Sequence, residues 1–206
     1  MFDRVHFPLA YAGQGLHPHR LALVFDILGC GALNAIADRS EANAKAHEYI
    51  GIAQSILASS RFTAQPSIAS VQTLLVICRF KTAMGATEES YALGGLALRL
   101  AQATGLHRDP AAWHIEWQEA DQRRALWHDC LFMDTMNALL LGRPCGVNSA
   151  HFDTAIPSGQ GLRWSQPNNV DGETGDFHRA KWTLSGIVHG VVDQAFGWRK
   201  PAYPSA

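Results

Sequence analysis

The sequence predicts an all-α domain of about six main helices packed as antiparallel pairs, with a long loop before the last helix. Three observations support this fold class. Every long segment with a regular apolar pattern repeats its apolar residues at i, i+3, i+4 and i+7, the spacing that gives a helix one buried side. The connections between these segments are short, as in paired antiparallel helices. Residues typical of helix ends flank two of the segments.

The first three helices are expected at residues 19–38, 41–59 and 67–84, with ends defined to within ~2–4 residues. The first two carry one apolar stripe each. Residues 71–78 are apolar on most sides of the third helix, which predicts a helix covered by its neighbours.

The next two helices are expected at 88–104 and 117–141, and their ends have recognisable residues. Thr87 is the predicted N-cap of the first, and Gly105 is the predicted glycine just past its carboxyl end. Gly142, with Pro144 shortly after it, is predicted to end the second helix.

The remaining residues complete one predicted domain that spans residues 1–197. Residues 158–176 are rich in Gly, Pro, Asn and Asp without periodicity, and they predict a mobile loop. A helix at 178–196 follows, and residues 198–206 are expected to form a tail. A chain of 206 residues, 47% hydrophobic, can bury one core of ordinary size.

Composition and charge exclude several classes of protein. The chain has a formal net charge of −1, whereas nucleic-acid-binding domains usually have a basic surface, so we expect no direct contact with nucleic acid. The chain has four cysteines, at Cys30, Cys78, Cys130 and Cys145, and they do not have the spacing of zinc ligands. We expect them to be buried free thiols of a protein in a reducing compartment. No secretory signal follows Met1 and no run of ~18 apolar residues occurs, so we expect no membrane span.

Asp134 is the polar residue on the apolar stripe of its helix, and a buried carboxylate needs a partner. We predict that Arg99, Arg123 or Arg143 pairs with it and fixes how two helices meet. The neighbouring Arg123 and Arg124 project ~100° apart on a helix, so one can face inward. The functional alternative is an arginine that binds a phosphate or carboxylate effector.

Catalytic and metal-binding interpretations receive little support. Ten histidines are present, but there is no HExxH motif and no pair of histidines four residues apart on one helix face, so we predict neither a metal nor a cofactor. His128, Asp129 and Cys130 are consecutive on a helix and point in different directions, so they cannot form a catalytic relay. We expect Cys130 in the core with His128 beside it. No nucleophile has a visible base, and we predict that the protein is not an enzyme.

Trp113, Trp117 and Trp127 surround the connection between the helices at 88–104 and 117–141. Aromatic side chains often line binding sites, so these three predict a pocket for a small apolar effector. The alternative is that they belong to the core.

Four ordered blocks between Tyr91 and Pro157 suggest a family: LALRLAQATGLHRDP, EADQRRALWHDCLFMD, LGRP and HFDTAIP. They resemble the fungal-specific transcription factor domain, the middle homology region of binuclear zinc cluster activators, and the resemblance extends more weakly over nearly the whole chain. The chain departs from the family pattern at Ala125, where the pattern has a third arginine, and at His128, where it has a second tryptophan. The residues singled out by the resemblance, with structural or regulatory roles implied, are Arg99, Gly105, Arg123, Arg124, Trp127, Asp134, Gly142, Arg143 and Pro144.

The resemblance implies a transcription regulatory domain, in the nucleus or the cytoplasm, that acts in effector response, inhibition or association. Its implied partners are other transcription regulators or a second copy of itself. The family's DNA-binding module needs six closely spaced cysteines, so we expect the zinc cluster and this module to be absent. One alternative is a helical small-molecule binding protein or enzyme that reuses the scaffold. Another is a truncated fragment of a larger activator, whose last helix would expose Leu184, Ile187, Val188 and Val191 and promote association.

Overall fold

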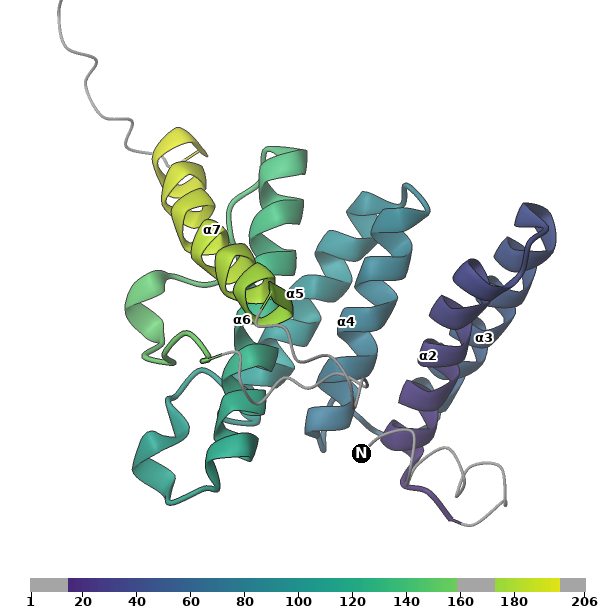
Figure 1. The fold of residues 1–206 in the computed structure, drawn as a ribbon, viewed down its shortest axis with the longest axis horizontal. Coiled ribbons are helices and arrows are strands. Elements are labelled where there is room, and N and C mark those ends of the chain that lie inside the picture. The colour runs from purple at the N-terminus through teal and green to yellow at the C-terminus, as the bar shows by residue number, and fades with distance from the viewer. Residues whose placement is uncertain (1–14, 159–172, 197–206) are drawn as a thin grey trace, which may run out of the picture. The chain divides into compact units, whose positions relative to one another are not determined.

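The computed structural model describes residues 15–158 and 173–196, and all regular structure in these ranges is helical (Figure 1). The all-α prediction is confirmed. The chain divides into two compact units, residues 1–84 and residues 85–206, which are described separately. A single domain over 1–197 remains a prediction. The predicted tail at 198–206, and all but the ends of the predicted loop at 158–176, lie outside the described residues.

The first unit consists of α2 (Pro18–Ala35), α3 (Arg39–Ser59) and α4 (Ile68–Ala83). Three residues join α2 to α3, so the two helices pack side by side as an antiparallel hairpin (Figure 1). Gly29 allows their close approach, because a Cβ there would lie 3.0 Å from Cγ1 of Ile50. The third helix packs mainly against α2 and is buried on most sides, as predicted.

Polar side chains define where the helices of this unit begin. The Asp38 carboxylate caps α3 by accepting from the Glu41 N–H at 2.8 Å. Ser67 and Ser70 each accept from the other's backbone N–H at the start of α4. The buried His19 Nδ1 lies 2.8 Å from Ser67 Oγ and ties the start of α2 to this cap. Burial lowers the pKa of His19, which favours its neutral form.

Asp26 lies in the middle of α2 with a fully buried side chain. Neither of its carboxylate oxygens has a hydrogen-bond partner. Burial alone raises the pKa of Asp26 to about 8, because an ionised carboxylate without a partner is poorly solvated there. The folded chain therefore holds Asp26 in its protonated form near neutral pH.

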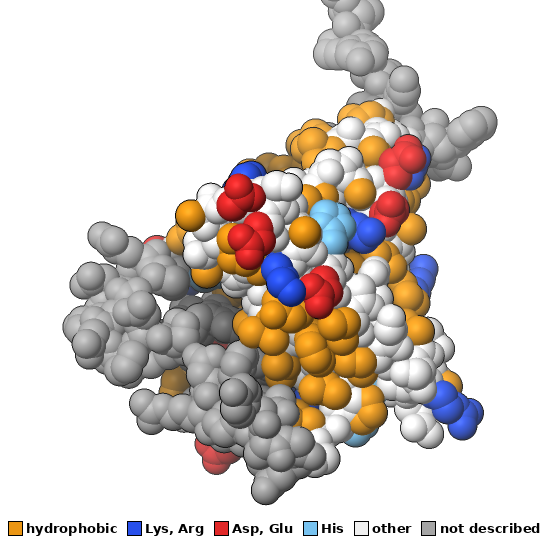
Figure 2. All heavy atoms as spheres, turned by 90° about the vertical axis from the view of Figure 1, so that its right-hand side faces the viewer, with side chains coloured by type: hydrophobic (Ala, Val, Ile, Leu, Met, Phe, Trp, Pro, Cys, Tyr) orange, Lys and Arg blue, Asp and Glu red, His pale blue; other side chains and the backbone are white. Residues whose placement is uncertain are grey.

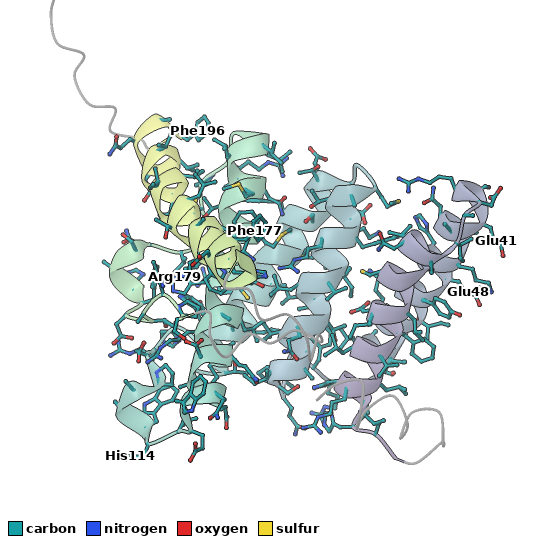
Figure 3. All side chains as sticks on the ribbon, viewed as in Figure 1. Glu41, Glu48, His114, Phe177, Arg179 and Phe196 are labelled. Atoms are coloured by element: carbon teal, nitrogen blue, oxygen red, sulfur yellow. The ribbon has the colours of Figure 1, made fainter. Side chains whose placement is uncertain are left out.

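The outer side of α2 and α3 carries both charged and apolar side chains. Figure 2 views this side, where apolar side chains gather in one area next to charged ones. Glu41 and Glu48 project from the first half of α3 (Figure 3), whereas its second half has no charged residue. The half-buried apolar side chains of the two helices include Phe25, Tyr49, Ile52 and Ile56.

The second unit contains three α-helices and two short 3-10 helices among its described residues: α5 (Thr87–Ala103), η2 (Pro110–Trp113), α6 (Trp117–Leu141), η3 (Ser149–His151) and α7 (Glu173–Phe196). The long α6 packs against both α5 and α7. The sequence predicted the α-helices but neither 3-10 helix. No described helix is both long and apolar enough to cross a membrane.

The predicted helix ends are confirmed except for one cap. Gly105 (φ 76°) and Gly142 (φ 63°) have left-handed backbones just past α5 and α6. The prediction of Thr87 as N-cap was wrong, because α5 already begins at Thr87 and Ala86 occupies the cap position without a side-chain bond. Glu88 and Glu89 still lie in the first turn, where their negative charges interact favourably with the positive end of the helix dipole.

Candidate regulatory site

A half-buried ion pair organises the connection between α5 and α6. Asp109, the N-cap of η2, accepts from Arg124 at two positions, 2.9 Å from Nε and 2.7 Å from Nη2. Its carboxylate also accepts from the N–H groups of Ala111 (2.9 Å) and Ala155 (2.8 Å). The Arg124 guanidinium holds the pKa of Asp109 well below its usual range. Two-point geometry on mostly buried side chains makes this a strong, directional contact.

Residues 152–158 are fastened to the same connection. Asp153 accepts from the Asp109 N–H at 2.8 Å, and the Thr154 hydroxyl donates to the Leu106 carbonyl at 2.9 Å. The Nε2 of His128 lies 3.2 Å and 3.1 Å from the carbonyls of Thr154 and Ala155, so it carries the proton and donates to them. Burial lowers the pKa of His128, which favours the neutral ring. The blocks RDP, RRALWH and HFDTAIP thus form one hydrogen-bonded cluster.

The expected core position of Cys130 with His128 beside it is confirmed, since both side chains are buried. Asp129 points elsewhere and accepts from Lys181 Nζ at 2.5 Å and Trp182 Nε1 at 2.8 Å. These two bonds fasten α7 to α6.

The predicted arginine partner of Asp134 was wrong. Asp134 Oδ2 accepts from the backbone N–H of Gly146 at 2.7 Å. The chain reverses at Gly142, and the following turn brings Gly146 back onto α6, where its N–H satisfies the carboxylate. A Cβ at Gly146 would lie 3.0 Å from Asp134 Oδ1 and 3.2 Å from Leu98 Cδ2, so the approach requires glycine. Burial raises the pKa of Asp134.

The three arginines proposed for Asp134 bind other groups of the same unit. Arg99 Nη1 donates to Gln102 Oε1 (2.9 Å), Arg123 Nη2 to the Thr104 carbonyl (3.1 Å), and Arg143 Nη2 to Glu88 Oε1 (3.1 Å). Arg143 also lies over the Tyr91 ring, and the Tyr91 hydroxyl donates to the Pro144 carbonyl at 3.0 Å. The LGRP turn is thereby attached to the start of α5.

The structure separates the three tryptophans that predicted an effector pocket. Trp127 is fully buried and packs near His107 and Phe152, so it belongs to the core. Trp113 is 41% exposed and Trp117 is 55% exposed. The Cζ of Arg123 lies 5.4 Å from the centroid of the Trp113 ring. An effector pocket at these residues remains a prediction.

The last helix is apolar on two sides. Its inner side buries Trp182 and Val192. On its outer side the apolar residues Phe177, Ala180, Leu184, Ile187 and Val191 recur every three or four positions, and we name this set the α7 stripe. Its four large members are 67%, 50%, 62% and 51% exposed in chain order. Figure 3 labels Phe177 near one end of α7 and Phe196 at the other.

The turn after α6 also places Cys145 beside α7. The Sγ of Cys145, a ring nitrogen of His189 and a carboxylate oxygen of Asp193 all lie within 4.8 Å of one another. Burial, with the nearby Asp134 carboxyl as the next cause, raises the pKa of the Cys145 thiol to about 11. In the sequence, the i, i+4 spacing of His189 and Asp193 is the signal that could have indicated this cluster.

These features define a helical fold in which the motif residues hold helices and connections together, while the outer side of α7 carries a row of exposed large apolar side chains. The chain belongs to the fungal specific transcription factor domain family, whose model matches residues 9–194. The resemblance of its sequence blocks to this family is confirmed.

Several relatives are named as transcriptional regulators. The transcriptional regulatory protein C777.02 of Schizosaccharomyces pombe is 33% identical over 133 residues, 61% of this chain and 21% of its own length. The transcriptional regulatory protein C1F7.11c of the same yeast is 29% identical over 77% of this chain and 22% of its own length. The activatory protein CHA4 of Saccharomyces cerevisiae is 26% identical over 59% of this chain and 21% of its own length. The chain thus spans about a fifth of these relatives. No solved structure matches it significantly.

Proposed function

We propose that this domain regulates transcription in the nucleus by associating, through the α7 stripe, with another transcription regulator or with a second copy of the chain. Its membership of the family and the names of its relatives support a transcription regulatory role. The near-neutral charge of the chain favours contact with protein rather than with DNA.

The α7 stripe is the observation that carries the proposal. Large apolar side chains that are half or more exposed are costly in water when they are contiguous, and such patches usually mark interaction sites. Their spacing is the one with which an amphipathic helix enters an apolar groove or pairs with another helix. Lys181 is the one charged residue between Arg179 and Asp193, and it points to Asp129.

The inner side of α7 holds the stripe in place. Trp182 is 2% exposed and donates to Asp129 on α6, and it packs with Ala125. A helix anchored by one side presents the other without losing further conformational freedom on binding, which favours association.

The test uses a Leu184→Glu, Ile187→Glu double variant in the 206-residue chain. A matched control is Thr183→Glu with Gln194→Glu, which adds the same charge at exposed polar positions of the same helix. Each chain is fused to a heterologous DNA-binding domain in yeast, and reporter transcription is measured with the mass of the purified chain by light scattering. We expect the stripe variant to lose the reporter response and any self-association, and the control to keep both. Unchanged reporter output and unchanged mass in the stripe variant would contradict the proposal.

Effector response is a second candidate function, favoured by the exposed ring of Trp113 next to the Arg123 guanidinium. Exposed aromatic rings beside a cation suit a small organic anion with an apolar body. Tryptophan fluorescence titrated with such anions should change in the native chain and not in a Trp113→Phe, Trp117→Phe variant. No saturable change with any of them would dismiss this candidate.

A further inference from the structure

The turn after α6 and the buried side of α7 bring together a thiol, an imidazole and a carboxyl. Cys145 reaches this position because the reversal at Gly142 and the Asp134 to Gly146 bond hold the turn on both sides of it. His189 and Asp193 are one helical turn apart on α7, so they face the same direction. The three potential ligand atoms lie within 4.8 Å of one another.

The ring of His189 is buried and has an unpartnered nitrogen. Its side chain is 8% exposed, and its Nε2 is buried without a hydrogen-bond partner. The nearest charged group is Asp193 Oδ2 at 3.5 Å. Buried ring nitrogens in native proteins usually have a partner, so the Nε2 of His189, which lies in this cluster 3.5 Å from Asp193 Oδ2, has a free position for a ligand.

We propose that Cys145, His189 and Asp193 bind a zinc ion. Thiolate, imidazole and carboxylate are the ordinary donors for Zn²⁺, with bond lengths of roughly 2.0–2.3 Å. Donor atoms in such a tetrahedral site stand roughly 3.3–3.7 Å apart, so the 3.5 Å between His189 and Asp193 fits already. Small side-chain rotations would bring in Cys145, which loses its proton to solvent on binding.

The surroundings suit a three-ligand site. Asp193 is exposed and Cys145 is half-buried, so a water molecule can complete the coordination from the solvent side. The buried carboxyl of Asp134 lies close enough to interact electrostatically with both Cys145 and His189. A bound ion would fasten the turn after α6 to α7.

The experiment uses the full 206-residue chain, freed of metal with a chelator, with Co²⁺ as a spectroscopic probe and Zn²⁺ as its competitor. We expect one Co²⁺ per chain, a thiolate-to-cobalt charge-transfer band, and displacement of this band by one equivalent of Zn²⁺. Cys145→Ala should abolish the band, and His189→Gln and Asp193→Asn should each weaken Zn²⁺ binding by about tenfold or more.

Two controls separate loss of the metal site from loss of folding or of an unrelated thiol. Cys30→Ser removes a half-buried thiol of the other unit and should leave the band unchanged. Asp193 is exposed, so Asp193→Asn should fold normally, as circular dichroism without metal would show. A native chain with no charge-transfer band, or a Cys145→Ala or Asp193→Asn variant that binds Zn²⁺ as tightly as the native chain, would overturn the proposal.

Discussion

Replacing Asp26 by asparagine should stabilise the chain at neutral pH. Asp26 is fully buried, neither oxygen has a hydrogen-bond partner, and its pKa is raised to about 8. Asparagine has nearly the same shape and no charge. It therefore mimics the protonated carboxyl that the folded chain requires and removes the free-energy cost of protonating this group on folding at neutral pH.

The size of the effect follows from proton linkage. The unfolded chain releases the Asp26 proton near pH 3.9, whereas the folded chain keeps it until about pH 8. The stabilisation of the folded chain by this proton is therefore fully present below pH ~4, and it is lost as the pH rises to the pKa of Asp26 in the folded chain. Between pH 5 and pH 7.5 the native chain should lose about 3 kcal/mol of unfolding free energy through this residue alone, at ~1.4 kcal/mol per pH unit.

Urea denaturation of native and Asp26→Asn chains at several pH values between 5 and 7.5 measures this effect. The difference between the two free energies of unfolding isolates Asp26, because His19 and His128, whose pKa values are lowered, contribute equally to both chains. Glu48→Gln, at an exposed position, is the matched control and should show no pH-dependent difference. A difference for Asp26→Asn that stays constant across this range would refute the reasoning.

Three further substitutions test the second unit by denaturation. Arg124→Lys removes the two-point contact with Asp109 and should lower the free energy of unfolding by about 1–3 kcal/mol. Arg108→Lys, at the exposed pair with Asp153, should lower it by less than about 0.5 kcal/mol. Equal losses in the two variants would contradict the role assigned to Arg124. Gly146→Ala should destabilise by about 1–3 kcal/mol through the contacts at 3.0 Å and 3.2 Å, while Gly190→Ala, with open space around its Cβ position, should stabilise by about 0.5–1 kcal/mol; a neutral Gly146→Ala would mean that the turn relaxes freely. Because the pKa of Asp109 is lowered, its ionised carboxylate stabilises the folded chain above pH ~4, and this stabilisation is lost as the pH falls. The free energy of unfolding of Asp109→Asn should therefore fall less steeply than that of the native chain as the pH is lowered. An equally steep fall would mean that other carboxylates cause the acid dependence.

The sequence could predict the helices because each one carries its own periodic pattern. The predicted ranges match the six α-helices of the described residues to within a few residues, except that α7 starts earlier than predicted, and Gly105 and Gly142 mark two ends. The error at Thr87 has a local cause, since a threonine can start a helix either as its cap or as its first residue. The short helices η2 and η3 are too brief to show a period.

The partners of the motif residues were harder to predict than the residues themselves. Asp134 was correctly predicted to need a partner. Its partner is the backbone N–H of Gly146, and because almost every residue has such a group, the sequence does not indicate which one is used. Arg124 and Asp109 were both in the motif blocks, yet their pairing depends on the path of the connection between them. Cys145 lies 44 residues before His189, so only the fold brings the two together.

The motif residues and the α7 stripe should fail in different ways when they are replaced. Asp109, Arg124 and Asp134 have their partners within the second unit, so we expect their replacement to change reporter output only through the folded fraction. Leu184 and Ile187 face outward, and charged replacements there should leave the free energy of unfolding nearly unchanged. In a plot of reporter output against unfolding free energy, motif variants should follow one curve, and stripe variants should fall far below it at native stability. Stripe variants that lie on the same curve would mean that the outer side of α7 contributes to folding and not to association.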